Sequence, residues 1–391
     1  MRWERSLRAL AIAKGSMLLA SQPVAASSET ILYNFPADVN PGFGLLPGKA
    51  NTFYGPTTDG GSENLGSIYQ LKQTKDGWKK KDIYSFGSND AHYPSAGLTQ
   101  GATSGVLYGV TSSGPNGDYG AIFSLTKEKN IWRETVLHEF DGSDGELPGA
   151  VLLRSSKIGY LYGSTEMGGD SNCGTLFQID GSGTFSRIFS FDSSDQGCNP
   201  SVPLQQDSSA KNLIGATSHG GASNVGTIYR LADSGGTWSE TVLHSLDGGS
   251  EGAYPSDLTP KDKSGLYYGV AQMNGFYNSG VVFQVGENIP YKVIYSFKGG
   301  SDGVHPLGLY LDASTGVLYG TTLLGGSQNK GTVFKLVFDG TQWNETILHS
   351  FTGGADGGSA IRRPVYKSGF LYGTAGSGGQ YGGGVAYQIT P

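Results

Sequence analysis

The sequence predicts an all-β fold, a seven-bladed β-propeller with four-stranded blades. Three observations predict it: a four-part motif that recurs seven times, the strand-like composition of each part, and two chain ends that complement each other. The dipeptide that ends the second part marks the copies, which are spaced 51–54 residues apart. The seven copies are Tyr54-Gly55, Tyr108-Gly109, Tyr162-Gly163, Ile214-Gly215, Tyr268-Gly269, Tyr319-Gly320 and Tyr372-Gly373. A repeat near this length is typical of propeller blades.

Each part of the motif has the composition of a short strand. It holds four to six residues rich in Val, Ile, Tyr, Phe and Thr, bounded by Gly, Asp, Asn or Pro. The third part starts with Gly and alternates, from Gly66-Ser-Ile-Tyr to Gly384-Val-Ala-Tyr, and the fourth closes on Phe or, once, on Leu246. No apolar period of 3.6 residues follows residue 26, so we expect almost no helix.

The two ends of the repeat region predict that the ring closes on itself. The repeats begin with a fourth part, Thr30 to Phe35, and stop after a third part, Gly384 to Ile389. An open solenoid is the alternative, but it would leave two exposed sheet edges that closure removes. We therefore expect the N-terminal strand to complete the C-terminal blade, with residues 31–35 beside residues 385–389.

A second, longer period runs through the fourth part of the motif. Alternate copies read Glu134-Thr-Val-Leu-His138, Glu240-Thr-Val-Leu-His244 and Glu345-Thr-Ile-Leu-His349, whereas the copies between them read as Ile-Tyr-Ser-Phe or Ile-Phe-Ser-Phe. The ring therefore looks built from a duplicated two-blade unit. Seven is odd, so two like blades must meet at one place. We expect the three histidines to be structural, packed against a neighbouring Trp or facing solvent.

Composition and the first residues predict an exported single domain. Residues 1–26 combine a basic start, an apolar stretch and a small-residue cleavage site, which indicates a signal peptide; an ordinary cytoplasmic helix is the alternative. Residues 27–391 then form one propeller domain, secreted or periplasmic, and we expect a monomer. No later run of about 18 apolar residues predicts a membrane span. With a net charge of −6, nothing in the sequence resembles a basic nucleic-acid-binding surface, and we expect no nucleic-acid partner.

Two cysteines fit export. Cys173 precedes the third strand of one repeat, and Cys198 lies in the loop that enters the next, so both loops should share a face. A disulfide between them would contribute roughly 3 kcal/mol, and two unrelated buried thiols are the alternative. The sequence has no CxxC or HxxxH pair, so we predict no metal site and no cofactor.

The sixth repeat carries a family resemblance. Its sequence L-Y-G-T-T-x-x-G-G-x-x-x-x-G-T-V-F-K-L, followed by L-H-S-F-x-G-G-x-D-G, resembles the GloVer tandem repeat, and the resemblance covers nearly everything after residue 28. It implies an extracytoplasmic protein, with no reaction attached. No anchor is visible, which favours free secretion or periplasmic residence over surface attachment. A looser kelch-like feature is the Gly-Gly pair after the second strand, as at Gly220-Gly221.

Candidate functional residues lie on the face that carries the longer loops, those that enter each first strand and those that join strands two and three. An acidic residue precedes the first strand in each of these loops. Such a residue most simply bonds its own turn, and a ring of carboxylates that binds calcium or sugar is the alternative. The residues that break the repeat are more informative: His92, Tyr93, His219, Tyr254, His305, Arg362 and Arg363.

These residues lead to three functional hypotheses. The first is an exported binding platform for a polysaccharide or a cell-surface protein, because aromatic rings stack on sugars and Arg binds acids bidentately. The second is a secreted polysaccharide lyase or hydrolase, in which Arg neutralises a uronate and His or Tyr transfers protons. The third is a purely structural envelope protein. Clustering of Arg362, Arg363, His92, His305 and Tyr254 around one pocket would favour the enzyme, and scatter would favour the other two.

Overall fold

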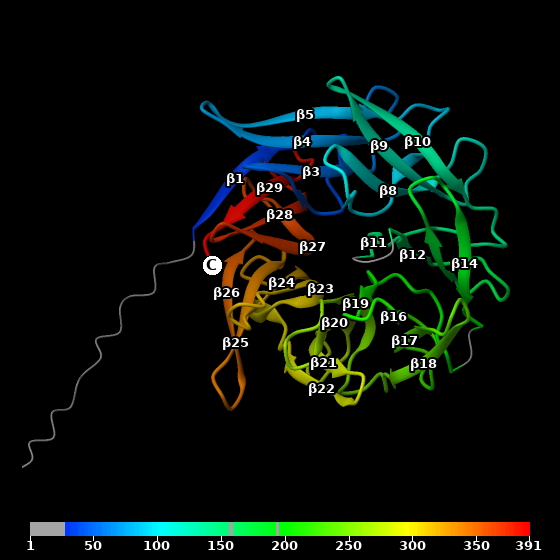
Figure 1. Cartoon of the computed structure of the whole chain (residues 1–391). Helices are drawn as coiled ribbons and strands as arrows, with labels where there is room; N and C mark the ends of the chain where they lie inside the picture. Colours follow the sequence, from blue (N-terminus) through cyan, green and yellow to red (C-terminus); the bar gives the residue numbers. More distant parts are fainter. Residues whose placement is uncertain (1–27, 156–158, 193–194) are drawn as a thin grey trace, which may run out of the picture.

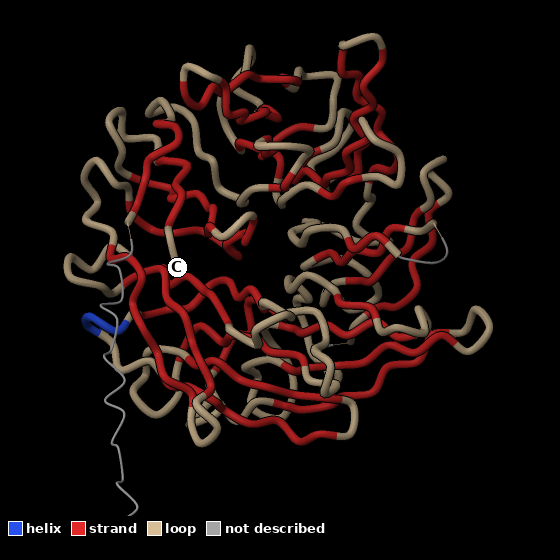
Figure 2. Tube along the Cα trace, turned by 60° about the vertical axis from the view of Figure 1, so that its left-hand side comes forward, coloured by secondary structure: helices blue, strands red, loops and turns tan. Residues whose placement is uncertain are grey.

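The computed structural model describes residues 28–155, 159–192 and 195–391, and it confirms the seven-bladed propeller. Seven antiparallel sheets follow one another around a ring, as Figure 1 shows. Figure 2 marks the helical segment of the described chain, the single 3-10 turn η1 (Gly300–Asp302). No helix in these residues has the length and hydrophobicity needed to span a bilayer. The predicted signal peptide, residues 1–26, lies outside the described residues.

The blades follow the sequence order of the repeats. Blade 1 contains β2 (Leu46–Pro47), β3 (Thr52–Thr57), β4 (Ser67–Thr74) and β5 (Gly77–Ser85). Blade 2 contains β6 (His92–Pro94) and β7 (Thr99–Gln100), which both pair with β8 (Val106–Ser113), and then β9 (Ala121–Glu128) and β10 (Ile131–Glu139). Blade 3 contains β11 (Leu153–Arg154), β12 (Leu161–Thr165), β13 (Thr175–Ile179) and β14 (Phe185–Ser190).

The remaining blades keep the same order. Blade 4 contains β15 (Gln205–Gln206), β16 (Asn212–Thr217), β17 (Thr227–Asp233) and β18 (Trp238–Ser245). Blade 5 contains β19 (Ala253–Leu258), β20 (Tyr267–Met273), β21 (Val281–Gly286) and β22 (Ile289–Ser296). Blade 6 contains β23 (Val304–Leu311), β24 (Leu318–Leu324), β25 (Thr332–Phe338) and β26 (Trp343–Ser350). Blade 7 contains β27 (Gly358–Lys367), β28 (Phe370–Ser377), β29 (Val385–Ile389) and β1 (Glu29–Asn34).

Strand β1 closes the ring as predicted. It pairs antiparallel with β29, with Ile31 opposite Tyr387 and Asn34 opposite Val385. The backbone N–H of Phe35 continues the ladder by donating to the carbonyl of Gly384 at 2.9 Å. Figure 1 shows the blue first strand beside the red last strand. The first described strand and the last one therefore share a single sheet, and neither is an edge of an open array.

The recurrent Tyr-Gly dipeptide has a packing reason. In each blade this Gly lies under the aromatic ring that alternates inward from the neighbouring third strand. A Cβ on Gly269 would lie 2.3 Å from the ring of Phe283, and one on Gly215 would lie 2.3 Å from the Tyr229 hydroxyl. These glycines thus make room for a ring, and the rings, among them Phe283 and Tyr229, are fully buried.

The core of the molecule lies between the blades. The described residues form seven hydrophobic clusters, and each joins two adjacent blades. The cluster between blades 4 and 5, for example, joins Ile228 of β17 to Phe283 of β21. Because every blade buries both of its faces against neighbours, no blade has a core of its own.

The outer strands carry the two-blade period into these interfaces. His138 stacks on Phe185 of the next blade with ring centroids 3.7 Å apart, and His244 stacks on Tyr291 at 4.2 Å. The predicted packing of these histidines against Trp is wrong, because the tryptophans instead contact the Tyr of the previous blade's Tyr-Gly dipeptide, as Trp238 does with Tyr162 at 5.9 Å. His138 and His244 thus each meet the ring that lies across the blade junction.

The structure joins Cys173 and Cys198 in a disulfide with a Cα–Cα distance of 4.6 Å. The bond connects the turn before β13 with the loop that enters blade 4, and the backbone N–H of Asn199 donates to the carbonyl of Cys173 at 2.9 Å. It therefore reinforces a contact between two successive blades.

Candidate functional site

The first strands of all seven blades surround a central cavity of about 310 Å³. Its wall is mainly apolar, with Leu45, Leu98, Leu152 and Leu204 contributed by the first four blades. Blade 7 contributes the charged side chains of Arg362 and Arg363, and blade 5 contributes Asp257. The cavity at the centre of the ring is therefore mainly apolar, and its charged side chains come from blades 5 and 7.

A bulge in β27 brings the two arginines to the cavity. The pairing of β27 with β28 shifts register between Ile361 and Val365, and Arg362 adopts a left-handed backbone conformation with φ of +65°. The hydroxyl of Thr321 donates to the Arg362 carbonyl at 2.9 Å, and the bulged backbone lies directly against Gly308 of β23. Bulges of this kind re-aim side chains next to functional sites.

Arg363 forms a largely buried ion pair with Asp257. Its Nε and Nη2 donate to the two oxygens of Asp257 at 3.0 and 2.6 Å, and Nη2 also donates to the carbonyl of Leu258 at 2.6 Å. Burial pulls the pKa of Arg363 down, but the attraction of Asp257 outweighs it and the net pKa is raised. Asp257 also accepts the backbone N–H groups of Leu258 and Leu309, each at 2.9 Å. This pair joins blades 5, 6 and 7.

Arg362 differs, because among the described residues its guanidinium has no hydrogen bond and no ion pair within 4.0 Å. The Cζ atom lies 5.7 Å from the centre of the Phe43 ring, in a cation–π contact. Burial lowers the pKa of Arg362, and Asp257 and Glu166 partly offset that effect. Burial raises the pKa of Glu166, and Arg362 partly offsets it. Both side chains border a second cavity of about 360 Å³ that shares Phe43 and Arg362 with the first.

The other predicted site residues lie away from this cavity. Of the residues that the structure describes, neither cavity lining includes His92, Tyr93, His219, Tyr254 or His305. His92 pairs with Tyr93 at a ring distance of 5.1 Å, and His219 pairs with Tyr254 at 5.3 Å. Two arginines therefore line the central cavity, which we call the central channel, and two separate His–Tyr pairs lie elsewhere.

The position before Pro has a backbone role that the sequence pattern concealed. Tyr93, Tyr254 and His305 all have φ between +55° and +58°, and each donates its N–H to the previous blade at 2.9–3.1 Å. His92 lies one residue earlier, so His305 is equivalent to Tyr93 and not to His92. These residues set the register between blades.

The acidic residues of the entry loops are turn residues, as the simpler interpretation predicted. The carboxylates accept backbone N–H groups within their own turns: Asp90 from Gly87, Asp144 from Asp141, Glu251 from Asp247, Asp302 from Lys298 and Asp356 from Thr352. Each also bonds the Tyr or His that lies two positions before the closing Phe or Leu of the preceding outer segment: Tyr84, His138, His244, Tyr295 and His349. They fix how each outer strand turns into the next blade.

Sequence reasoning missed three residues of the channel: Phe43, Glu166 and Asp257. Asp257 carried a signal, since it places a charge between Ser256 and Leu258 in a first strand where all other repeats but the seventh have apolar or small residues. Phe43 and Glu166 carried none, because they lie in loops whose approach to Arg362 depends on the ring.

We expect two outer-strand glutamates to make the stability of the protein depend on pH. Burial, followed by a neighbouring acid (Asp90 or Asp192), raises the pKa of Glu134 and of Glu240 to about 7. A pKa raised in the folded state favours folding fully below about pH 4.5, and that contribution is lost as pH rises through 7. We expect Glu134→Gln and Glu240→Gln each to stabilise the protein at pH 8 by on the order of 1 kcal/mol, with little effect at pH 4.5.

Urea unfolding at the two pH values measures this difference. Glu128→Gln is the matched control, because the Glu128 carboxylate is 64% exposed. Equal stability of Glu134→Gln and the unmodified chain at pH 8 would contradict the prediction.

Comparison with known proteins identifies the repeat and the fold. The profile of the Gloeobacter/Verrucomicrobia repeat matches residues 18–160, 133–307 and 257–391. No curated protein matches the sequence significantly. Among solved structures, the chain is similar to a protein assigned as a 6-phosphogluconolactonase from Bacteroides uniformis, with TM-score 0.56 and 13% identity over 83% of this chain and 90% of that one.

Two further structures give the same result. A hypothetical selenium-binding protein from Sulfolobus tokodaii matches with TM-score 0.56 and 11% identity over 77% of this chain and 76% of that one. A puromycin-hydrolyzing peptidase from Mycobacterium tuberculosis matches with TM-score 0.55 and 10% identity over 89% of this chain but 53% of its own. At these identities the likeness concerns the propeller fold alone.

Proposed function

The chain belongs to the Gloeobacter/Verrucomicrobia repeat family, and from this premise and the channel geometry we propose that it is an exported binding protein for acidic carbohydrate. The ligand is an acidic sugar, a uronate residue of an envelope polysaccharide, held in the central channel. Export is supported by the signal-like residues 1–26 and by the Cys173–Cys198 disulfide, since disulfides persist in oxidising compartments.

The observation that carries this proposal is the contrast between two adjacent arginines. Arg363 has its Nε and Nη2 donors occupied by Asp257 and Leu258, whereas Arg362 faces the cavities with no ion-pair or hydrogen-bond partner in the described structure. A guanidinium presents donors that match a carboxylate bidentately. The Phe43 ring beside it supplies an apolar face on which a sugar ring can stack.

Calorimetric titration with glucuronate, galacturonate, glucose and galactose tests the proposal. The two uronates should bind and the two neutral sugars should not. Arg362→Gln should weaken uronate binding at least about tenfold, because a charge-assisted pair is lost. Arg133→Gln, which alters an exposed arginine (67% exposed) on the β9–β10 hairpin, should leave binding unchanged. Binding that tolerates Arg362→Gln, or no preference for uronates over neutral sugars, overturns the assignment.

A second function, cleavage of an acidic polysaccharide, is favoured by Glu166. Its raised pKa and its place beside Arg362 in one cavity are the properties of a group that exchanges a proton with a bound uronate. Incubation with acidic polysaccharides, followed by the absorbance of unsaturated uronates, distinguishes the two functions. Binding without unsaturated product removes the lyase.

A further inference from the structure

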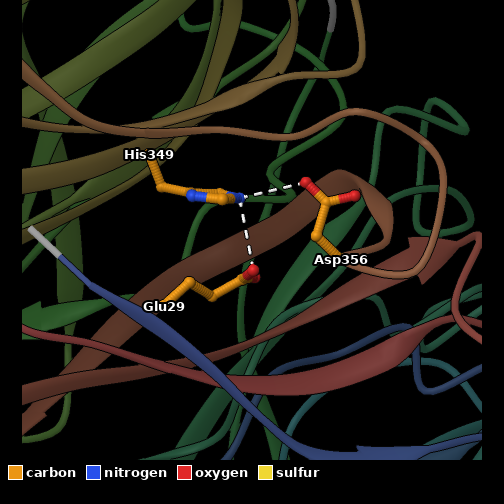
Figure 3. A group of neighbouring side chains, drawn as sticks. All are labelled: Glu29, His349 and Asp356. Carbon is orange, nitrogen blue, oxygen red and sulfur yellow. Dashed lines mark hydrogen bonds and ion pairs between the residues drawn. The ribbon is translucent and has the colours of Figure 1, made fainter.

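The junction between blades 6 and 7 contains a group of three potential metal ligands. Figure 3 shows Glu29 of β1, His349 of β26 and Asp356 of the following loop converging on one point. The His349 Nε2 atom lies 3.5 Å from a Glu29 oxygen and 3.2 Å from an Asp356 oxygen. In the part of the chain that the structure describes, this is the one such group whose ligand atoms all lie within 4.8 Å of one another.

The odd number of blades creates this group. At each junction, two outer-strand residues face each other. One lies two positions before the closing Phe or Leu of its blade, and the other lies six positions before the closing residue of the next blade. His138 therefore faces Phe185 and His244 faces Tyr291. Between blades 6 and 7 the alternation fails, because blade 7 takes its outer strand from β1, and His349 meets Glu29. An imidazole and two carboxylates come together there.

The distances at this junction differ from those at the equivalent ones. His138 binds Asp144 at 2.7 Å and His244 binds Glu251 at 2.8 Å, which are lengths of charge-assisted hydrogen bonds. His349 stands 3.2 Å from Asp356 and 3.5 Å from Glu29, and one N–H can donate to only one of them. Ligand atoms around a tetrahedral ion with bonds of about 2.1 Å lie about 3.4 Å apart. Both distances from His349 match ligands that share a cation, and all three ligand atoms lie within 4.8 Å of one another.

Among the described residues, neither Glu29 nor Asp356 forms an ion pair with a lysine or an arginine, and one of the two carboxylates is held rigidly. The side chains of Glu29 and Asp356 are only 12% and 16% exposed, and the second oxygen of Glu29 is buried without a partner. Asp356 is oriented by Thr352, whose backbone N–H donates to the ligand oxygen at 2.8 Å and whose hydroxyl bonds the other oxygen. Such outer bonds orient carboxylate ligands in metal sites.

We propose that Glu29, His349 and Asp356 bind one first-row divalent ion of the Zn²⁺ class, with water completing the coordination. One nitrogen and two carboxylate oxygens suit this class, whereas Ca²⁺ takes six to eight oxygen ligands. The ion links the strand that closes the ring to a histidine more than 300 residues later in the chain. The bound ion would stabilise the closed ring, and its site is separate from the channel around Arg362.

Metal titration of the chelator-treated full chain tests the proposed metal site. Zn²⁺ alone should bind with a stoichiometry of one and raise the melting temperature by at least about 3 °C. Mg²⁺ and Ca²⁺ at the same concentration should do neither. Co²⁺ in place of Zn²⁺ should produce the visible absorption of a nitrogen- and oxygen-ligated site.

Variants at equivalent junctions provide matched controls. His349→Ala and Glu29→Gln should each weaken Zn²⁺ binding at least about tenfold, as expected when a ligand or its partner is lost. His244→Ala and Glu134→Gln, the same substitutions where no third ligand is present, should bind Zn²⁺ as the unmodified chain does. Glu29→Gln keeps the size of the side chain and guards against misfolding of His349→Ala. Absence of stoichiometric Zn²⁺ binding, or binding that survives both ligand substitutions, overturns the proposal.

Discussion

Deleting residues 29–34 is expected to abolish the cooperative thermal unfolding of the protein and to make it self-associate. Strand β1 supplies the whole outer strand of blade 7, so its loss exposes the backbone groups of β29 along one edge. It also uncovers Tyr387 and Ile389, which are fully buried. Burial of Leu32 in β1 is lost as well, and the combined cost should exceed about 5 kcal/mol.

Scanning calorimetry and light scattering measure the two effects, and a peptide supplied in trans tests their cause. A synthetic peptide with residues 28–36 should bind the truncated chain by adding a strand to β29 and should restore a monomeric species with a cooperative transition. A scrambled peptide of the same composition should not. A truncated chain that stays monomeric with an unchanged melting temperature would show that closure by β1 contributes little.

The architecture was predictable because its determinants are local and repeated. Every copy of the dipeptide, six times Tyr-Gly and once Ile-Gly, places a Gly beneath an aromatic ring of the neighbouring strand, so the same requirement appears seven times in the sequence. Closure was predictable for the same reason, since a missing fourth strand at one end and a spare one at the other follow from counting the parts.

The site was only partly predictable, because its contacts join distant blades. Arg362 and Arg363 broke the repeat equally, yet their roles differ through Asp257, which lies 106 positions before Arg363. Tyr93 and His305 also stood out, but their position serves a left-handed backbone before Pro, a requirement that a side chain does not announce. Local patterns identify exceptions to the repeat and leave open which of them face the channel.

The predictability of the group formed by Glu29, His349 and Asp356 is intermediate between that of the architecture and that of the channel site. No spacing motif links Glu29 with His349, and the sequence led us to expect no metal site. A two-blade period in an odd ring nevertheless requires one junction of like blades. That junction brings the Glu of one outer strand to the His of another, as the structure shows. Periodicity combined with closure thus contains information about a site that no contiguous motif carries.

The second large effect concerns the pair between Asp257 and Arg363, and Asp257→Ala should lower the free energy of unfolding by about 3–5 kcal/mol at pH 7. The Asp257 side chain is 5% exposed and accepts four hydrogen bonds, two from Arg363 and two from backbone N–H groups. Its removal leaves those donors and a largely buried guanidinium without their acceptor. Urea unfolding measures the loss.

A double-mutant cycle separates the ion pair from the lost backbone contacts. Arg363→Met in the Asp257→Ala background should recover part of the stability, because the unpaired guanidinium is removed while the N–H groups of Leu258 and Leu309 stay unsatisfied. The exposed pair Arg133–Glu128 is the control, and its cycle should give a coupling below about 0.5 kcal/mol. If the coupling between Asp257 and Arg363 were as small as that of the control pair, the bulge in β27 would be held by its backbone contacts to Thr321 and Gly308. Arg363 would then be as free as Arg362 to bind a ligand.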